Sequence, residues 1–512
     1  MNLDAQPKGW WSCHWFGAGL AAILIFSAAA RLCRIDGMGG YDDGVYLMAA
    51  WLLSKGYHLY TEIAVDQFPM FMVPAGWLFS LLGPSEVLAR AIEVAYSLAG
   101  IAAVAYTGKL LWQPAAGLAA GLFLSLAPVY FVTSRQFIGS VSSAAVTALA
   151  VLCSLLYYVS GRRRWLIVAG LAFSLSLLIK PIAWSSSLVF VWVIVARRWG
   201  DVPANGTGLT ARLRSLPWRA TWLDFLSLGL AGLVLPAICL ALFNGPAMLR
   251  LILDVESRRA TLGAAWVEAL LGVYLYRTLP LLLLAAWGLI LIARRRPDGR
   301  QAVPVVWLGL GLATFLVWGG VQTHHRVLLD LPVALLAARS IGELGTLRGL
   351  DGQHWWRTSW SGILSILLIG YYVANLPWLA GYVATSPPQG QDQPLGRDAA
   401  SPGAIQLLQQ VTTPDQFVVT DSQGLAFAAR RMVPPALADT SQMMIDSGVV
   451  SEQTVRQVAE EQGAALVLWS NRFADSFPTL ERWARETYSH HKDFLWKQVI
   501  YYQKRASPAE NP

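Results

Sequence analysis

The sequence predicts a polytopic α-helical membrane protein with about eleven or more transmembrane helices, followed by a small C-terminal soluble α/β domain. Hydrophobic residues make up 55% of its 512 residues and charged residues only 14%, whereas soluble domains contain about 25% charged residues. The apolar residues gather in runs that approach the roughly 20 residues needed to cross a bilayer. These runs end near residue 381, where a more polar composition begins, so the soluble unit is expected at the C-terminus.

The apolar runs define the expected transmembrane helices. They lie near residues 17–33, 86–108, 115–132, 142–160, 164–179, 182–197, 223–243, 271–293, 303–320, 326–343 and 361–381. If the N-terminus is cytoplasmic, the basic loops such as 162–164 and 294–296 also fall on the cytoplasmic side, as membrane orientation requires. Topology therefore explains the net charge of +8, which does not indicate a nucleic-acid partner. We expect a multi-pass cell-membrane protein whose C-terminal domain is external.

The expected transmembrane domain, residues 1–385, contains a long first external loop at residues 34–85. Segment 68–82 of this loop is apolar but too short to span comfortably. Its two prolines, Pro69 and Pro74, favour a bent segment. We therefore expect a re-entrant or interfacial helix at this position.

The C-terminal region is expected to consist of a linker at residues 386–402 and a domain at residues 403–505. Short apolar runs predict buried strands at Phe417–Thr420, Ala465–Leu468 and Val499–Tyr502, and helical spacing is found at 403–411, 451–462 and 478–488. Strands that alternate with helices indicate a small α/β domain. The domain contains no Gly-rich phosphate loop and no nucleophile elbow, so we assign it no chemistry.

Asp42 and Asp43 form the only adjacent pair of acids in the membrane part of the chain, and they follow the first expected helix. A carboxylate at a membrane surface can act as a general base and deprotonate an acceptor hydroxyl. The alternative is that both acids solvate the loop or cap a helix that begins near Gly44. Residue type and position leave both interpretations open.

Several basic residues are expected on the external face near apolar segments, where a lone charge is costly. They are Lys55, Arg135, Lys180, Arg258, Arg259 and Arg326. A lipid-borne phosphate would satisfy them, although each alone could also be an interfacial residue whose charged end reaches water. The adjacent His324 and His325 point in different directions on a regular backbone, which disfavours a shared metal ion. No soluble cofactor is implied, and a divalent metal at Asp42 or Asp43 stays an open possibility without an evident third ligand.

The order of these motifs resembles a known family. The motifs are Tyr41–Leu47, Gly56–Tyr60, Gln67–Pro69, Ser134–Gln136, Lys180–Pro181 and His325 at the start of a late span. Over residues 17–345 the chain resembles the membrane-embedded GT-C glycosyltransferases, in the branch of the protein O-mannosyltransferases and the aminoarabinose transferases that act on lipid A. The C-terminal domain resembles their external domains more loosely.

This resemblance implies an inverting transfer of a sugar from a polyprenyl-phosphate carrier to an acceptor on the external face. It places the catalytic base at Asp42, and Asp43 stands where the family usually has Glu. The substrate-binding residues that it implies are Tyr41, Lys55, Tyr60, Gln67, Arg135, Lys180, Arg258 and His325, of which Lys55, Arg135, Lys180 and Arg258 would contact the carrier phosphate. In one place the chain departs from the pattern. Related sequences often carry an acid after the equivalent of Arg135, but this chain has Phe137–Val141 there.

The expected partners are a polyprenyl-phosphate-linked sugar donor, membrane lipids and a protein, lipid or glycan acceptor. The competing hypothesis is a transporter or flippase of lipid-linked sugars, whose signature would be internal repeats with broken spans at matching positions. The sequence shows no such repeat by inspection. A catalytically silent membrane scaffold is a third hypothesis, and it would be favoured if Asp42 faced away from any cavity.

Overall fold

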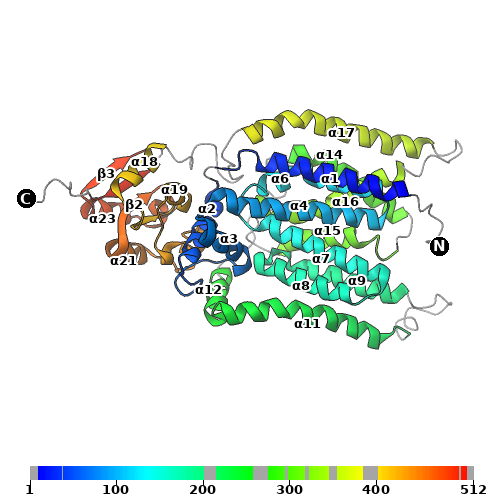
Figure 1. The fold of residues 1–512 in the computed structure, drawn as a ribbon, viewed down its shortest axis with the longest axis horizontal. Helices are drawn as coiled ribbons and strands as arrows, with labels where there is room; N and C mark the ends of the chain where they lie inside the picture. Colours follow the sequence, from blue (N-terminus) through cyan, green and yellow to red (C-terminus); the bar gives the residue numbers. More distant parts are fainter. Residues whose placement is uncertain are drawn as a thin grey trace, which may run out of the picture.

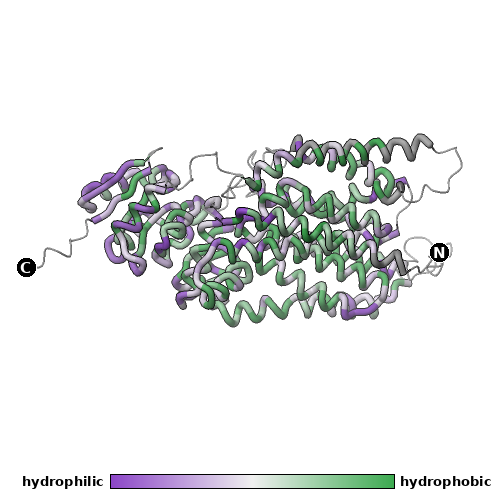
Figure 2. Tube along the Cα trace, turned by 45° about the horizontal axis from the view of Figure 1, so that its top comes forward, coloured by the Kyte–Doolittle hydropathy of each residue, from purple (hydrophilic) through white to green (hydrophobic). Residues whose placement is uncertain are grey.

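The computed structural model describes most of the chain. The described residues are 10–36, 39–200, 215–257, 275–294, 298–317, 322–344, 355–384, 402–494 and 498–503. They form a long helical bundle with a smaller mixed domain at one end (Figure 1). Figure 2 shows that hydrophobic residues dominate the bundle, whereas hydrophilic residues are frequent in the C-terminal domain. The protein is thus a multi-pass membrane protein by composition and architecture.

Every predicted transmembrane segment is occupied by a helix. The helices are α1 (Trp10–Leu32), α4 (Glu86–Leu111), α5 (Pro114–Leu126), α7 (Ser140–Ser160), α8 (Arg164–Ile179), α9 (Ser187–Gly200), α11 (Trp218–Leu242), α14 (Leu275–Arg294), α15 (Val303–Val317), α16 (Val327–Leu344) and α17 (Trp355–Ala384). In the described part of the chain, six helical segments are both long and apolar enough to cross a membrane. The number of eleven spans therefore stays a prediction.

Two predicted spans are interrupted by proline. The segment 115–132 divides into α5 and the short α6 (Pro128–Thr133), because Pro128 has no backbone N–H and starts a new helix. The segment 182–197 begins with the 3₁₀ helix η2 (Pro181–Ser186), which continues into α9. Both interruptions lie at the end of the bundle that faces the C-terminal domain, so irregular backbone is found there (Figure 1).

Shorter helices cover the same end of the bundle (Figure 1). They are α2 (Tyr41–Ser54), α3 (Pro69–Leu82) and α12 (Gly245–Ser257). The helix α3 occupies the segment predicted to be re-entrant or interfacial, with Pro69 in its first turn and Pro74 inside it. The sequence did not predict the full extent of α2, which begins three residues before Gly44. Residues expected to form an external loop contain α12 instead.

The C-terminal domain contains a four-stranded sheet in the order β1-β2-β4-β3. Its strands are β1 (Phe417–Thr420), β2 (Gly463–Leu468), β3 (His490–Asp493) and β4 (Val499–Tyr502), of which only β1 and β2 are parallel. Its helices are α18 (Pro402–Val411), α19 (Gln423–Ala428), α20 (Gln442–Asp446), α21 (Glu452–Gln462), α22 (Arg472–Ser476) and α23 (Leu480–Thr487). The three predicted strands are present. The predicted linker at 386–402 lies almost entirely outside the described residues.

The C-terminal domain packs tightly on α2 and its neighbours. A Cβ atom at Gly44 of α2 would overlap the backbone of Gly424 in α19. The backbones of the two helices therefore approach each other without an intervening side chain. Beside this contact, the ring of Phe427 packs edge-on against Trp51, with 5.4 Å between ring centroids. Arg430 donates a hydrogen bond of 2.6 Å to the Pro84 carbonyl. The start of α2 therefore lies between the bundle and the C-terminal domain.

Candidate active site

The two adjacent acids at the start of α2 are held very differently. Asp43 is 1% exposed, and its Oδ2 lies 2.6 Å from Nη2 of Arg90 in α4. Its Oδ1 accepts hydrogen bonds from Arg90 Nε at 3.1 Å and from the Phe137 backbone N–H at 2.6 Å. Asp42 is half-buried and has no hydrogen bond or ion pair with any residue that the structure describes. The fold thus uses both oxygens of Asp43, whereas the Asp42 carboxylate has no such partner among the described residues.

Helix geometry explains this division. Successive residues of an α-helix point about 100° apart, so Asp43 can face α4 while Asp42 faces the C-terminal domain. Both acids lie in the first turn of α2, where the helix dipole stabilises negative charge. The preceding Gly39 passes directly over the ion pair, because a Cβ there would lie 2.9 Å from Nη2 of Arg90 and would overlap the Asp43 carboxylate. A glycine is therefore required at this position.

Residues 134–140, which we call the bridging loop, connect α6 to α7 and are fully buried. Besides Asp43, a second acid binds this loop. Oε1 of Glu93 in α4 accepts a hydrogen bond of 2.6 Å from the Gly139 N–H, and Oε2 accepts one of 2.8 Å from the Ser142 hydroxyl. Gly139 has a φ of +73°, a conformation that glycine adopts without steric cost. Two buried carboxylates therefore fix the path of the bridging loop.

Lys180 reaches the same loop from the other side. Its Nζ donates to the Ser140 hydroxyl at 3.2 Å and to the Ile138 carbonyl at 3.4 Å. Asp43 and Lys180 thus bind successive residues of the bridging loop, Phe137 and Ile138. The acidic end of α2 and Lys180 are held close together by one short segment of backbone.

Lys180 belongs to a buried basic cluster, which consists of Lys180, His324, His325 and Arg326. Nζ of Lys180 lies 3.2 Å from Nε2 of His324, and the two histidine rings pack edge-on at 4.3 Å. His324, His325 and Arg326 belong to the short 3₁₀ helix η3 (Thr323–Arg326). Arg326 donates a hydrogen bond of 2.5 Å to the Thr278 hydroxyl in α14. The cluster gathers positive charge behind the bridging loop.

Arg135 was expected to contact a carrier phosphate, but its guanidinium is bound to the end of α1. It donates to the carbonyls of Ala30 at 3.0 Å, Cys33 at 2.9 Å and Arg34 at 3.1 Å. The residue is fully buried. Since these carbonyls have no partner within α1, Arg135 completes the hydrogen bonding of that helix end. This geometry supports a structural role for Arg135 in place of a phosphate contact.

Of the other predicted site residues, Gln67 contacts an acid, since its side-chain amide donates a hydrogen bond of 2.9 Å to Oδ1 of Asp66. Lys55 is exposed at the C-terminal end of α2, about 20 Å along the helix axis from Asp42 at about 1.5 Å per residue. Tyr60 and Gln67 contact each other, since the Tyr60 hydroxyl donates to the Gln67 carbonyl at 2.8 Å. Arg258, like the neighbouring Arg259, lies outside the described residues.

Tyr41 lies beside Asp42 and contacts the C-terminal domain. Its hydroxyl accepts a hydrogen bond of 3.1 Å from the Thr440 backbone N–H, and the guanidinium carbon of Arg472 lies 3.4 Å from the centre of its ring. Burial and the nearby Asp439 raise the pKa of the Tyr41 hydroxyl well above its ordinary value. Tyr41 therefore stays neutral and attaches the start of α2 to the domain.

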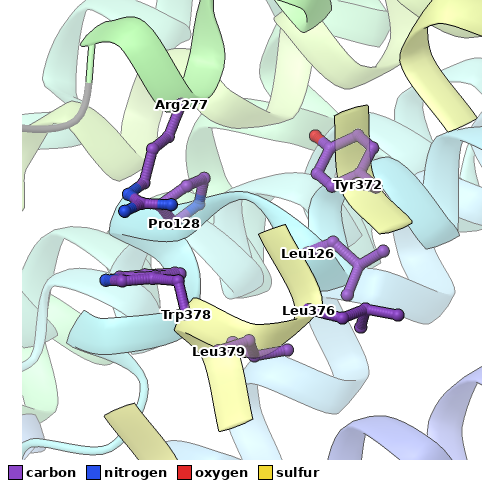
Figure 3. Close-up of a pocket in the computed structure, with 7 residues that line it drawn as sticks. All are labelled: Leu126, Pro128, Arg277, Tyr372, Leu376, Trp378 and Leu379. Atoms are coloured by element: carbon purple, nitrogen blue, oxygen red, sulfur yellow. The ribbon is translucent and has the colours of Figure 1, made fainter. Parts of the chain in front are cut away.

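A small apolar pocket, with a cavity volume of about 20 Å³, lies between the α5–α6 junction, α14 and α17 (Figure 3). It is lined by Leu126, Pro128, Arg277, Tyr372, Leu376, Trp378 and Leu379. The guanidinium carbon of Arg277 lies 4.5 Å from the centre of a Trp378 ring. Arg277 directly precedes Thr278, to which Arg326 of the basic cluster donates. The pocket and the basic cluster are therefore adjacent.

Comparison with known proteins identifies this architecture. The sequence family described as dolichyl-phosphate-mannose-protein mannosyltransferase matches residues 66–213. The structure of ArnT from Cupriavidus metallidurans bound to undecaprenyl phosphate matches with a TM-score of 0.60 at 16% identity, over 97% of this chain and 98% of that chain. The chain has a GT-C glycosyltransferase fold.

A second solved structure has the same GT-C fold. The oligosaccharyltransferase AglB from Archaeoglobus fulgidus, in complex with an inhibitory peptide and a dolichol-phosphate, matches with a TM-score of 0.55 at 14% identity. The match covers 90% of this chain and 70% of that chain. No curated protein sequence matches the chain. The predicted resemblance to GT-C enzymes of the mannosyltransferase and ArnT-like branch is confirmed.

Four charged residues around the GT-C site were not predicted from the sequence. Arg90 and Glu93 lie inside an apolar segment, and this alone is a signal, because intramembrane charges are costly unless they are paired. Asp66 follows an irregular stretch of the first loop, and Asp439 belongs to the C-terminal domain, to which no chemistry was assigned. We call Asp42, Asp66 and Asp439 the acidic cluster, because the first two raise the pKa of the Asp439 carboxyl.

The structure also shows which acid contacts the chain after Arg135, where related sequences often carry an acid of their own. Glu93 supplies a carboxylate to this segment from α4, at Gly139 and Ser142. Among the described residues, no group of three or more His, Cys, Asp or Glu side chains is arranged to hold a metal ion. We therefore describe the site by its acidic cluster, its basic cluster and the bridging loop.

Proposed function

We propose that this protein transfers a sugar from a polyprenyl-phosphate carrier to an acceptor on the external face of the membrane, with inversion at the anomeric carbon. The observation that carries the proposal is that Asp43, the neighbour of Asp42 in α2, and Lys180 of the basic cluster bind consecutive residues of the bridging loop, Phe137 and Ile138. A transfer of this kind needs a base for the acceptor and positive charge for the leaving phosphate.

In the proposed reaction, Asp42 accepts the proton of the acceptor nucleophile. The acceptor atom forms a bond to the anomeric carbon while the bond between this carbon and the carrier phosphate oxygen breaks. The phosphate leaves with the bonding electrons, and the basic cluster stabilises the negative charge that it gains. Asp43 does not take part directly, because Arg90 and the Phe137 amide hold it in place.

The carrier is proposed from two features. The solved structures of ArnT and AglB contain undecaprenyl phosphate and a dolichol-phosphate, which share an isoprenoid chain and a phosphate. In this chain, the apolar pocket beside Arg277 adjoins the basic cluster (Figure 3). An isoprenoid tail in contact with this pocket would bring its phosphate toward Lys180 and Arg326.

The external location is proposed from the distribution of basic residues. Lys109, Arg164, Arg198 and Arg294 all lie at the helix ends opposite the C-terminal domain. Cytoplasmic loops of membrane proteins are enriched in such residues. The C-terminal domain and the acidic cluster would then face the outside of the cell.

The test is sugar transfer in proteoliposomes with a panel of labelled polyprenyl-phosphate sugars. Asp42→Asn should reduce transfer about 10²- to 10⁴-fold, as expected for loss of a general base, while binding of undecaprenyl phosphate is retained. Glu62→Gln is the matched control, because Glu62 is an exposed acid of the same loop. If the wild-type protein moved the labelled lipid between leaflets without transferring its sugar, the transporter hypothesis would replace this proposal.

A further inference from the structure

The C-terminal domain reaches the start of α2 at several points. The Thr440 backbone N–H donates to the Tyr41 hydroxyl at 3.1 Å. The Ala64 N–H donates to the Pro435 carbonyl at 3.1 Å, which attaches the first external loop to the same part of the domain. Asp439 directly precedes Thr440, and Asp42 directly follows Tyr41. This hydrogen bonding therefore places Asp439 at the interface beside Asp42.

Asp439 is an unusual side chain for such an interface. It is 3% exposed, and its Oδ1 accepts a hydrogen bond of 2.8 Å from the Ser441 N–H. Asp66 and Asp42 are the charged groups that raise its pKa, after burial itself. Arg472 is stacked on the Tyr41 ring at the same interface. A third carboxylate is thus buried against two others.

A tyrosine hydroxyl points into the same acidic cluster. Tyr46 of α2 is 5% exposed, and its hydroxyl has no hydrogen-bond partner among the described residues. Asp42, Asp66 and Asp439 all act on this hydroxyl and raise its pKa well above the ordinary value, after burial itself. The Tyr46 hydroxyl is therefore a further polar group beside the acidic cluster.

We propose that the C-terminal domain completes the Asp42 site and that Asp439 is its positioning residue. This inference rests on the proposed function, because it concerns the same base. Asp439 acts through Asp42: as a neutral carboxylic acid it closes the site without adding a third negative charge. If it ionised, three carboxylates would face one another, which would weaken the domain contact and disturb the position of Asp42.

The direction of the pH dependence follows from burial. Burial and the charge of Asp66 raise the pKa of the Asp439 carboxyl well above its ordinary value. A carboxyl whose pKa is higher in the folded protein stabilises the folded state at low pH. This contribution is lost as the pH rises through the raised pKa. Because burial and Asp66 raise the pKa of Asp439 to about 8, the protein should lose this stability as the pH rises from the ordinary carboxyl range to about 8, and Asp439 should cause no further loss above it.

The experiment compares Asp439→Asn with Asp446→Asn in the full-length protein. Asn keeps the shape of a protonated Asp but cannot ionise, and Asp446 is an exposed acid of the same domain. Two profiles are measured between about pH 5 and about pH 10: the midpoint of thermal unfolding and the rate of sugar transfer. In the wild-type protein and in Asp446→Asn, stability should fall as the pH rises toward the raised pKa and then level off, and transfer should fall by up to about tenfold per pH unit above that pKa. In Asp439→Asn, both profiles should lack these changes.

Losses with rising pH in Asp439→Asn equal to those of the wild type would overturn the role of Asp439. If Asp439 had only a structural role, Asp439→Asn would change the stability by the same amount at every pH. The shapes of its stability and transfer profiles would then match those of the wild type. If no variant transferred sugar but only Asp439→Asn had a flat stability profile, the proposed function would fail, while the placement of Asp439 in the domain contact would be supported.

Discussion

The two ends of the helical bundle treat buried acids in opposite ways. At the end away from the C-terminal domain, Asp224 of α11 accepts hydrogen bonds from the Tyr157 hydroxyl at 2.5 Å, from Arg163 Nε at 2.8 Å and from Arg198 Nε at 2.7 Å. At the other end, Asp439 is buried against Asp42 and Asp66, and the basic cluster lies beyond the bridging loop. Asp224 is thus paired with basic residues where it joins helices. The acidic cluster and the basic cluster are separate where we propose that the substrate binds.

The substitution Asp43→Ala should have the largest effect on stability. Asp43 lies at the end of the bundle that faces the C-terminal domain, but it is paired with a basic residue, as Asp224 is at the other end. Its partner is Arg90. Asp43→Ala should leave the fully buried Arg90 without its counter-ion and should lower the free energy of unfolding by about 3–5 kcal/mol. Thermal unfolding in detergent measures this. Asp475→Ala, at an exposed acid, should change stability by less than about 0.5 kcal/mol. A change as small as this at Asp43 would show that the ion pair does not hold α2 to α4.

Asp224→Ala should have an intermediate effect. It also leaves arginines behind, but Arg163 is 42% exposed and Arg198 is 16% exposed, so both can be rehydrated. We expect a loss of about 1–3 kcal/mol, in the range for a buried polar group that loses its partner. Thermal unfolding and transfer are measured on the same preparation. Folded protein should transfer sugar at the normal rate, and a large loss of rate would contradict the distinction between the two ends.

Lys180→Met should give the smallest effect of the series. Removing one cation from the basic cluster should weaken undecaprenyl phosphate binding by about tenfold, which corresponds to about 1.4 kcal/mol. Lys55→Met is the matched control, since Lys55 was predicted for the same role but lies exposed at the far end of α2. Binding can be followed by titration of the purified protein with the lipid. Equal losses in both variants would indicate general attraction to an anionic lipid and no defined phosphate site.

Much of the fold was predictable, because membrane helices and buried strands have strong apolar patterns. The helices over 142–160 and 164–179 and the strand Phe417–Thr420 were found in this way. The strand β3 was not, since its sequence His490–Asp493 is polar and three of its residues are exposed. The helix α12 was missed for a similar reason: it is short and amphipathic, and membrane-length patterns do not detect such helices.

The site was predictable only in part. The motif around Asp42 was visible in the sequence, and Lys180 was placed at the correct end of a span. The different roles of Asp42 and Asp43 were not visible, because they depend on Arg90, which lies 47 residues beyond Asp43. Asp439 was not predicted either, because it lies in the C-terminal domain, far along the sequence from the motifs around Asp42. Its position follows from the hydrogen bond between Thr440 and Tyr41, which is a tertiary contact that no sequence pattern reveals.

The contact between Arg135 and the end of α1 has a consequence for biogenesis. The carbonyls of Ala30, Cys33 and Arg34 receive these hydrogen bonds from a residue that is synthesised about one hundred positions later. During translation, the carbonyls at this end of the first helix can therefore bind only water or lipid headgroups until Arg135 is in place. The first helix becomes locked into the nascent bundle when the hairpin that carries Arg135 has been inserted.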